Sequence, residues 1–214
     1  NTGVVPVPDG RLDVLEKMYH PKKRTPATLE FVDIAGLVKG ASRGEGLGNR
    51  FLSYIREVDA IVHVVRCFED DNIIHVDGTV DPARDIDIIQ TELVLADLET
   101  VQKRETKAAH LVKNGDKRLQ YELDAAKKLS EHLNQGKPAR TCQLSEAEQS
   151  ACADWFLLTQ KKVIYAANIG EADLGQPESS LPLVRRVREI AEAEGSQVLV
   201  ICARIEEEIA QLEE

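Results

Sequence analysis

Four short apolar runs, separated by helix-length segments, constrain the fold of this chain more than any other feature. The runs have the length and the β-branched composition of buried strands, and they cover residues 28–32, 60–68, 162–167 and 197–201. Segments with apolar residues three or four positions apart adjoin them, over residues 49–58, 84–113, 119–133, 145–158 and 183–194. Ser145 and Glu148 have the spacing of a capping box at the start of one of these helices. Strands that alternate with helices in this way predict an α/β fold with a mostly parallel sheet flanked by helices.

Two of the helical patterns adjoin each other with only a short turn between them. Apolar residues recur at helical spacing over 84–113 and again over 119–133, and the run Asn-Gly-Asp at 114–116 offers a helix stop, a turn and an N-cap. We therefore expect an antiparallel helical hairpin inserted into the α/β unit. The expected division of the chain is residues 1–82, 83–140 and 141–214, with the hairpin in the middle part.

The charge of the chain is unevenly distributed. The whole chain carries a net charge of −10, which argues against broad affinity for nucleic acids, and recognition of a DNA sequence is not expected. Residues 101–140 contain ten Lys or Arg and five Asp or Glu, so this stretch is +5 and the remainder is −15. The basic hairpin is a candidate surface for an anionic partner. The alternative is a solvated helical face whose lysines only confer solubility, and Tyr121 alone among its residues could stack on a base.

Composition indicates a globular protein of the cytoplasm. Hydrophobic residues make up 43% of the chain and charged residues 30%, enough to bury a core. We expect no contact with a membrane, because no apolar run is long enough to span one and no signal peptide pattern is present. The four cysteines show no C-x-x-C spacing, so we expect reduced, structural thiols.

The segment at residues 33–49 carries the first candidate site. Asp33 would emerge at the carboxyl end of a strand, where a carboxylate can hold Mg²⁺ through water. Gly36, three residues on, would let its backbone N–H approach a terminal phosphate. Five glycines between Gly36 and Gly48 give the segment little conformational preference, which suits a loop that orders on a γ-phosphate. A glycine-rich surface loop is the alternative for the D-x-x-G pattern alone.

Residues 33–49 resemble the switch II region of the Obg-related NTPases, and closely that of the YchF or Obg-like ATPase family. The resemblance covers essentially the whole chain, with residues 1–9 similar to the segment that follows switch I in the family. It implies the G domain of a TRAFAC-class P-loop NTPase. No G-x-x-x-x-G-K-[ST] occurs in the chain, and the family places that loop upstream and a small TGS domain downstream. We therefore expect a fragment of a larger NTPase, with no appreciable hydrolysis on its own.

The second candidate motif is Asn168-Ile169-Gly170-Glu171, directly after a predicted strand. GTPases have N-K-x-D here, and its Asp accepts hydrogen bonds from the N1–H and amino groups of guanine. Adenine has an acceptor at N1 and would leave that carboxylate unpaired. The N-x-x-E variant of the family is associated with ATP binding, sometimes alongside GTP. The resemblance implies that Asn168 contacts the base edge and that Ile169 lies against the ring. Taken alone, N-x-x-E after a strand is better explained by a turn with an Asn cap, and its place after Asp33 in this order of elements favours base binding.

The third candidate motif is Cys202-Ala203-Arg204, after the last predicted strand. It matches the base-supporting S-A-K loop of GTPases in position, with Cys for Ser and Arg for Lys. Backbone groups do much of the work in that loop, so the substitutions are compatible with binding of the base. An ordinary strand-to-helix turn is the alternative.

The residue after Gly36 bears on hydrolysis. Many GTPases place a Gln there to orient the attacking water, and this chain has Leu37, which cannot hydrogen-bond water. His75 lies in the loop after the strand over 60–68, and the family has a histidine at this position that is thought to substitute for the Gln. An imidazole titrates near neutrality and can accept or relay a proton. An ordinary exposed histidine is the alternative.

These observations lead to one function and two alternatives. We expect a translation-associated switch that hydrolyses ATP or GTP with Mg²⁺ and binds the ribosome or a ribosomal subunit. The first alternative is a non-catalytic module that binds the ribosome or RNA through the basic hairpin. A dinucleotide-binding protein is disfavoured, because the run G-E-G-L-G at 44–48 lacks G-x-G-x-x-G spacing.

Overall fold

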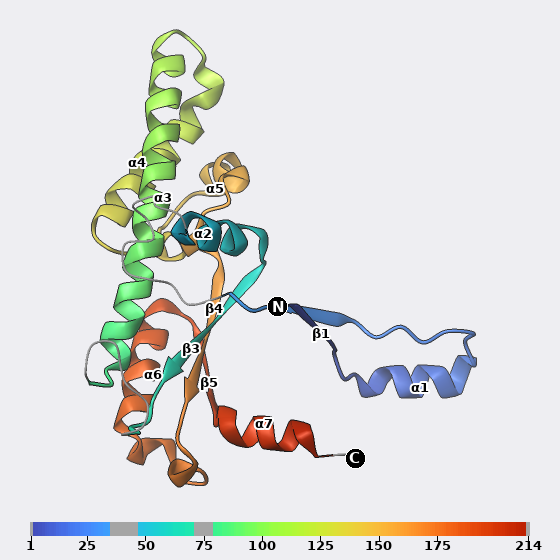
Figure 1. Ribbon diagram of the computed structural model, residues 1–214. Coiled ribbons are helices and arrows are strands. Elements are labelled where there is room, and N and C mark those ends of the chain that lie inside the picture. Colours follow the sequence, from blue (N-terminus) through green and yellow to red (C-terminus); the bar gives the residue numbers. More distant parts are fainter. Residues whose placement is uncertain (1, 35–46, 71–78, 213–214) are drawn as a thin grey trace. The chain divides into compact units, whose positions relative to one another are not determined.

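The computed structural model of the chain describes residues 2–34, 47–70 and 79–212 (Figure 1). Its contacts form two compact units, Asn1–Gly36 and Leu37–Glu214, which are described separately. The three-part division at residues 82 and 140 stays a prediction. None of the helices in the described ranges is long and apolar enough to cross a membrane.

The first unit is a two-stranded antiparallel ribbon with a helix in its connection. Strand β1 (Thr2–Pro6) pairs with β2 (Thr28–Val32), and α1 (Gly10–Tyr19) lies between them in the chain. The Asp9 side chain caps α1 by accepting a hydrogen bond from the Arg11 N–H at 3.0 Å. Sequence patterns did not predict β1 or α1.

The prediction that residues 28–32 form a strand is confirmed, but the expected environment of that strand is wrong. We expected a buried strand of the parallel sheet, whereas β2 is antiparallel to β1 and exposes Leu29 and Phe31 by about half. An apolar run of five residues fits a two-stranded ribbon as well as a buried strand, so composition alone does not identify the partner.

The second unit contains a three-stranded parallel sheet. Its strands are β3 (Ala60–Arg66), β4 (Lys162–Asn168) and β5 (Gln197–Ile201), in the order β3-β4-β5. The register brings the strand ends together, with Asn168 opposite both Arg66 and Ile201. The prediction of an α/β fold with parallel strands is confirmed.

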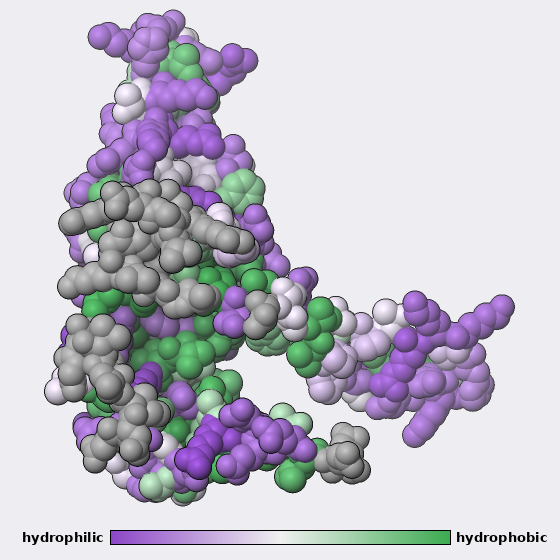
Figure 2. Space-filling view, viewed as in Figure 1, coloured by the Kyte–Doolittle hydropathy of each residue, from purple (hydrophilic) through white to green (hydrophobic). Residues whose placement is uncertain are grey.

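One face of this sheet packs against α3 (Pro82–Lys113) and α6 (Pro182–Glu194) (Figure 1). The core between them contains Val65, Ile86, Tyr165, Val184 and Val187, all almost completely buried. Side chains of the opposite face, Val62, Val64 and Leu199, are exposed in the part of the chain that is described. Figure 2 shows this apolar surface over the strands of the sheet.

The predicted hairpin is confirmed and consists of α3 and α4 (Gln120–Asn134). The turn follows the predicted run at 114–116. Asn114 caps α3, Gly115 adopts the left-handed region with φ of 101°, and Asp116 accepts a hydrogen bond from the Arg118 N–H. The two helices are held together by a second apolar core that includes Val101, Ala126, Leu129, Leu133 and Trp155.

Three further helices complete the second unit, namely α2 (Leu47–Glu57), α5 (Glu146–Cys152) and α7 (Ala203–Gln211). The predicted capping box of α5 is present, with the Ser145 N–H donating to Glu148 Oε2 at 2.8 Å. The helix is shorter than the predicted 145–158, because the chain tightens into a 3-10 turn after Cys152 and Phe156 then adopts a positive φ of 49°. No residue range was predicted for α7, although the alternative given for residues 202–204, a strand-to-helix turn, implied a helix there.

The hairpin joins the sheet through polar side chains that are buried or partly buried, which we call the hairpin base and define as Asp97, Arg140, Thr159 and Glu194. Asp97 is completely buried in α3 and accepts three hydrogen bonds, from Leu158 N–H at 2.8 Å, Thr159 N–H at 2.7 Å and the Thr159 hydroxyl at 2.6 Å.

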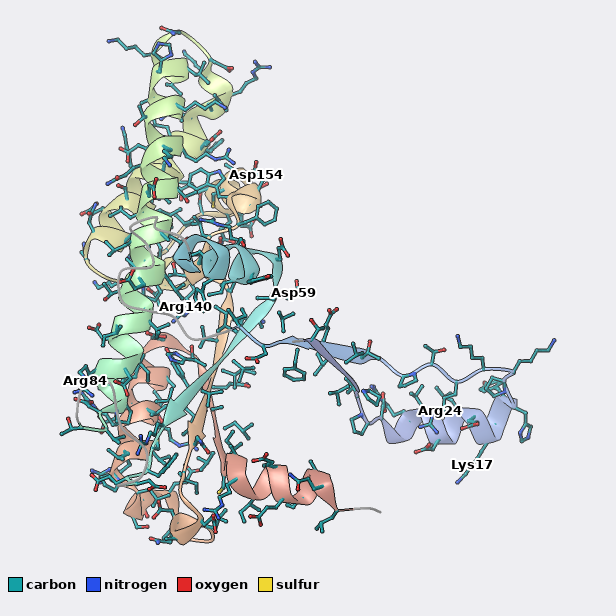
Figure 3. The ribbon with its side chains drawn as sticks, viewed as in Figure 1. Lys17, Arg24, Asp59, Arg84, Arg140 and Asp154 are labelled. Atoms are coloured by element: carbon teal, nitrogen blue, oxygen red, sulfur yellow. The ribbon has the colours of Figure 1, made fainter. Side chains whose placement is uncertain are left out.

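A partly buried ion pair forms the other part of the hairpin base. Arg140 pairs with Glu194 of α6, and the exposed fractions of the two side chains are 14% and 11%. Figure 3 labels Arg140 where the hairpin meets the sheet. The Tyr165 hydroxyl of β4 donates to the same carboxylate at 3.1 Å. The hairpin is therefore attached to both the strand and the helix that form the core of the sheet.

Candidate functional site

A cavity of about 710 Å³ lies at the carboxyl ends of the parallel strands. This is the edge where open α/β sheets bind ligands. Residues that follow β3, β4 and β5, together with the start of α6, line it. They are Cys67, Phe68, Glu69, Asp70, Asn168 to Asp173, Gln176, Ser180 to Leu183, Cys202 and Arg204. Five of the residues predicted to hold the base are among them, so the fold brings the second and third motifs to one site.

Asn168 connects the second motif to the third. It is the last residue of β4, and its side-chain oxygen accepts a hydrogen bond from the Ala203 N–H at 2.9 Å. Backbone hydrogen bonds extend the pairing of the three strands at this position. The Cys67 N–H donates to the Asn168 carbonyl and the Ile169 N–H donates to the Ile201 carbonyl, both at 2.8 Å. Cys202 occupies the N-cap position of α7 without a side-chain capping hydrogen bond, so the third motif forms a strand-to-helix turn. The role of this turn in supporting a base stays a prediction.

Ile169 and Cys202 form the apolar floor of this site. Ile169 is 6% exposed and belongs to the core cluster under the cavity, together with Cys67 and Leu181. Burial raises the pKa of the Cys67 thiol to about 12, so this side chain stays neutral at physiological pH. A planar apolar ligand could lie on such a floor without meeting a buried charge.

Glu171 and Arg204 form an ion pair at the cavity. Arg204 Nε lies 2.7 Å from Glu171 Oε1, and the exposed fractions of the two side chains are 71% and 44%. The same nitrogen lies 3.8 Å from Glu208 Oε1, one turn further along α7. Both partners of the pair were predicted site residues, but their pairing was not predicted, because 33 positions separate them in the sequence.

Phe68 also lines the cavity and was not predicted from the motifs. It ends the predicted strand over 60–68, and the Arg66 guanidinium lies 4.8 Å from the centre of its ring. Arg66 Nε also donates to the Phe68 carbonyl at 3.0 Å. An aromatic side chain at the end of a strand of a parallel sheet was the sequence signal that could have indicated this position.

The phosphate-side residues predicted from the first motif are only partly described. Asp33 is exposed and directly follows β2 of the antiparallel ribbon, and not a strand of the parallel sheet as expected. Its role in holding Mg²⁺ through water stays a prediction. Gly36, Leu37 and His75 lie outside the described residues, so the roles assigned to them stay predictions.

Comparison with known proteins gives consistent results. A family model described as "50S ribosome-binding GTPase" matches residues 12–114. The chain is 50% identical to "Ribosome-binding ATPase YchF" of Bacillus subtilis and 49% identical to that of Escherichia coli O157:H7, over its whole length and 58% of each relative. The solved structure of the YchF GTPase of Schizosaccharomyces pombe matches with a TM-score of 0.81 and 37% identity, over 100% of this chain and 58% of that one. The chain thus spans less than two thirds of the length of these relatives, and its fold is that of a P-loop GTPase. Half of the residues of this chain are identical to those of a YchF relative along its whole length, and the fold is the same. The chain therefore belongs to the YchF family of Obg-related P-loop NTPases.

Proposed function

We propose that the protein is a nucleotide-dependent switch of the cytoplasm that binds the ribosome and hydrolyses ATP, with GTP as a second substrate. The observation that carries the proposal is the joining of two separate sequence motifs at one cavity, through the hydrogen bond between Asn168 and the Ala203 N–H. That cavity lies at the ligand-binding edge of a parallel sheet.

The composition of the site favours adenine over guanine. An Asn side chain beside a base can hydrogen-bond its edge, and the apolar Ile169 stands where GTPases have the Lys of N-K-x-D. The one acid of the N-x-x-E motif, Glu171, is engaged by Arg204. Adenine needs no carboxylate acceptor at this place, so the engaged Glu171 costs it nothing.

Hydrolysis would depend on the first motif. In this proposal Asp33 holds Mg²⁺ through water, the Gly36 N–H contacts the γ-phosphate and His75 positions the attacking water. The magnesium ion would neutralise charge on the phosphates. Leu37 cannot orient water, which makes slow turnover the expected behaviour until a partner binds.

Binding to the ribosome would depend on the hairpin. Lys107, Lys113 and Lys117 are exposed near its turn, and within the described ranges none of them pairs with a carboxylate. Lysines that have no carboxylate partner and lie on a projecting element are suited to contact the phosphate backbone of a nucleic acid. Two curated relatives carry the name ribosome-binding ATPase. The same lysines favour the second candidate, a module that binds the ribosome or RNA without turnover.

Calorimetric titration with ATP and with GTP, each with Mg²⁺, tests the proposal. The titration compares this chain with a version joined to an upstream P-loop segment from the Bacillus subtilis relative. We expect the joined version to bind ATP more tightly than GTP and to hydrolyse it, and the shorter chain to bind weakly. If the joined version bound and hydrolysed neither nucleotide, the enzyme function would be wrong and the binding module would remain.

A further inference from the structure

The ion pair between Arg204 and Glu171 bridges two turns that the fold already holds together. Glu171 begins the 3-10 turn after β4, and Arg204 is the second residue of α7. The hydrogen bond from the Ala203 N–H to Asn168 fixes the distance between these two turns. Both charged side chains line the cavity, so their pairing changes which hydrogen-bonding groups the cavity offers.

We propose that Arg204 determines base specificity by occupying the Glu171 carboxylate, and this inference rests on the proposed binding of a nucleotide in the cavity. Guanine presents two adjacent donors, N1–H and the 2-amino group, which together require both oxygens of a free carboxylate. Adenine presents an acceptor at N1 and gains nothing from that carboxylate. A Glu171 that is held by Arg204 therefore penalises GTP and leaves ATP unaffected.

The size of the penalty follows from the exposure of the pair. Glu171 would have to leave Arg204 in order to turn both oxygens toward guanine, so GTP binding would cost the free energy of the ion pair. Exposed ion pairs contribute roughly 0.2–1 kcal/mol, which corresponds to a change of up to about fivefold in a dissociation constant. Arg204 thus adjusts the preference between the two nucleotides and does not by itself exclude GTP.

A double-mutant cycle in the version joined to the P-loop segment tests this role. We expect Arg204→Ala to lower the Kd for GTP by about two- to fivefold and to leave the Kd for ATP unchanged, since it frees the Glu171 carboxylate. In the Glu171→Gln background the side chain has one acceptor oxygen and an NH₂ group in place of two acceptor oxygens, so it cannot pair with both guanine donors as a carboxylate does. The same Arg204→Ala change should then have no effect. The combination separates an effect through Glu171 from direct contact between Arg204 and the base.

Arg186→Ala breaks an ion pair of similar exposure, that with Glu189 in α6, and should leave both dissociation constants unchanged. If the parent protein bound neither nucleotide, the proposed function would fail and this inference with it. If it bound both and Arg204→Ala left their ratio unchanged, or changed it equally with Gln at position 171, the inference alone would be overturned.

Discussion

The hairpin base and the carboxyl edge of the sheet both depend on hydrogen-bonded charged side chains, but they differ in how far those side chains are removed from water. In the hairpin base Asp97 is completely buried, and the Arg140 and Glu194 side chains are 14% and 11% exposed. At the edge, Arg204 and Glu171 are 71% and 44% exposed.

The difference in exposure indicates a structural role for the hairpin base and a binding role for the edge of the sheet. A buried charge is expensive to leave unpaired, so its partners cannot exchange easily, whereas an exposed pair costs little to open. The hairpin base is therefore suited to hold the hairpin in one position on the sheet. The edge is suited to exchange its internal partners for those of a ligand.

The largest expected effect is at the hairpin base. Asp97→Ala removes the acceptor of three hydrogen bonds and leaves the N–H groups of Leu158 and Thr159 buried without a partner. We expect the free energy of unfolding to fall by about 4 kcal/mol, as measured by urea denaturation. Asp154→Ala is the matched control, because that exposed carboxylate lies 3.6 Å from Arg104 and should contribute less than about 1 kcal/mol. Equal losses in the two variants would remove the distinction between the regions.

The next effect is a dependence of stability on pH through His63 of β3. Its ring lies 5.6 Å from that of Tyr165, and burial lowers the pKa of His63 from 6.5 to about 4, although Asp85 and Glu194 partly oppose the shift. Between about pH 4 and pH 6.5 the imidazole is therefore neutral in the folded protein and protonated in the unfolded chain. Stability that is fully present above pH 6.5 is therefore lost as the pH falls toward 4.

The loss through His63 between pH 7.5 and pH 5 is expected to be up to about 2 kcal/mol. Urea denaturation at several pH values measures it, and His63→Phe, which keeps a ring against Tyr165, should reduce the slope. Burial also lowers the pKa of His132, so some dependence on pH should remain in the variant. An unchanged slope in His63→Phe would show that the environment of this side chain is not the cause.

A smaller effect is expected at the edge. Asn168→Ala removes the hydrogen bond to the Ala203 N–H, and that N–H can then bond to water because the turn is exposed. We expect stability to change by less than about 1 kcal/mol and the Kd for ATP in the version joined to the P-loop to rise about tenfold. Denaturation and calorimetry on the same variant compare the two changes. A large loss of stability with unchanged affinity would make Asn168 a structural residue, and the edge would then not differ from the hairpin base in role.

Sequence patterns predicted local features far better than pairings between distant residues. The turn at residues 114–116 and the capping box at Ser145 were correct, because their contacts lie within a few residues of each other. Strand β2 was assigned to the wrong kind of sheet, since its partner is chosen by tertiary contacts that composition does not encode.

The candidate site shows the same limit. Asn168 and Arg204 were recognised from their place after strands, but the ion pair of Arg204 with Glu171 required the geometry of the sheet edge. Asp97 gave no signal at all, because an acid within a helical pattern is usually solvated and its burial depends on the loop at Leu158 and Thr159.

The smallest effect on stability is expected at the far end of the hairpin. Lys107, Lys113 and Lys117 are exposed and unpaired within the described ranges, so changing all three to Glu should alter the free energy of unfolding by only about 1 kcal/mol or less. Binding to the ribosome should nevertheless weaken strongly, because each contact between a lysine and a phosphate releases a counterion.

Co-sedimentation with ribosomes at increasing salt measures this weakening of binding, with Lys103→Glu and Lys127→Glu as controls nearer the hairpin base. If the triple variant sedimented like the parent at every salt concentration, the turn of the hairpin would not be the contact. Because the three lysines lie outside the hairpin base, a loss of binding in a variant of unchanged stability would be assigned to the contact itself.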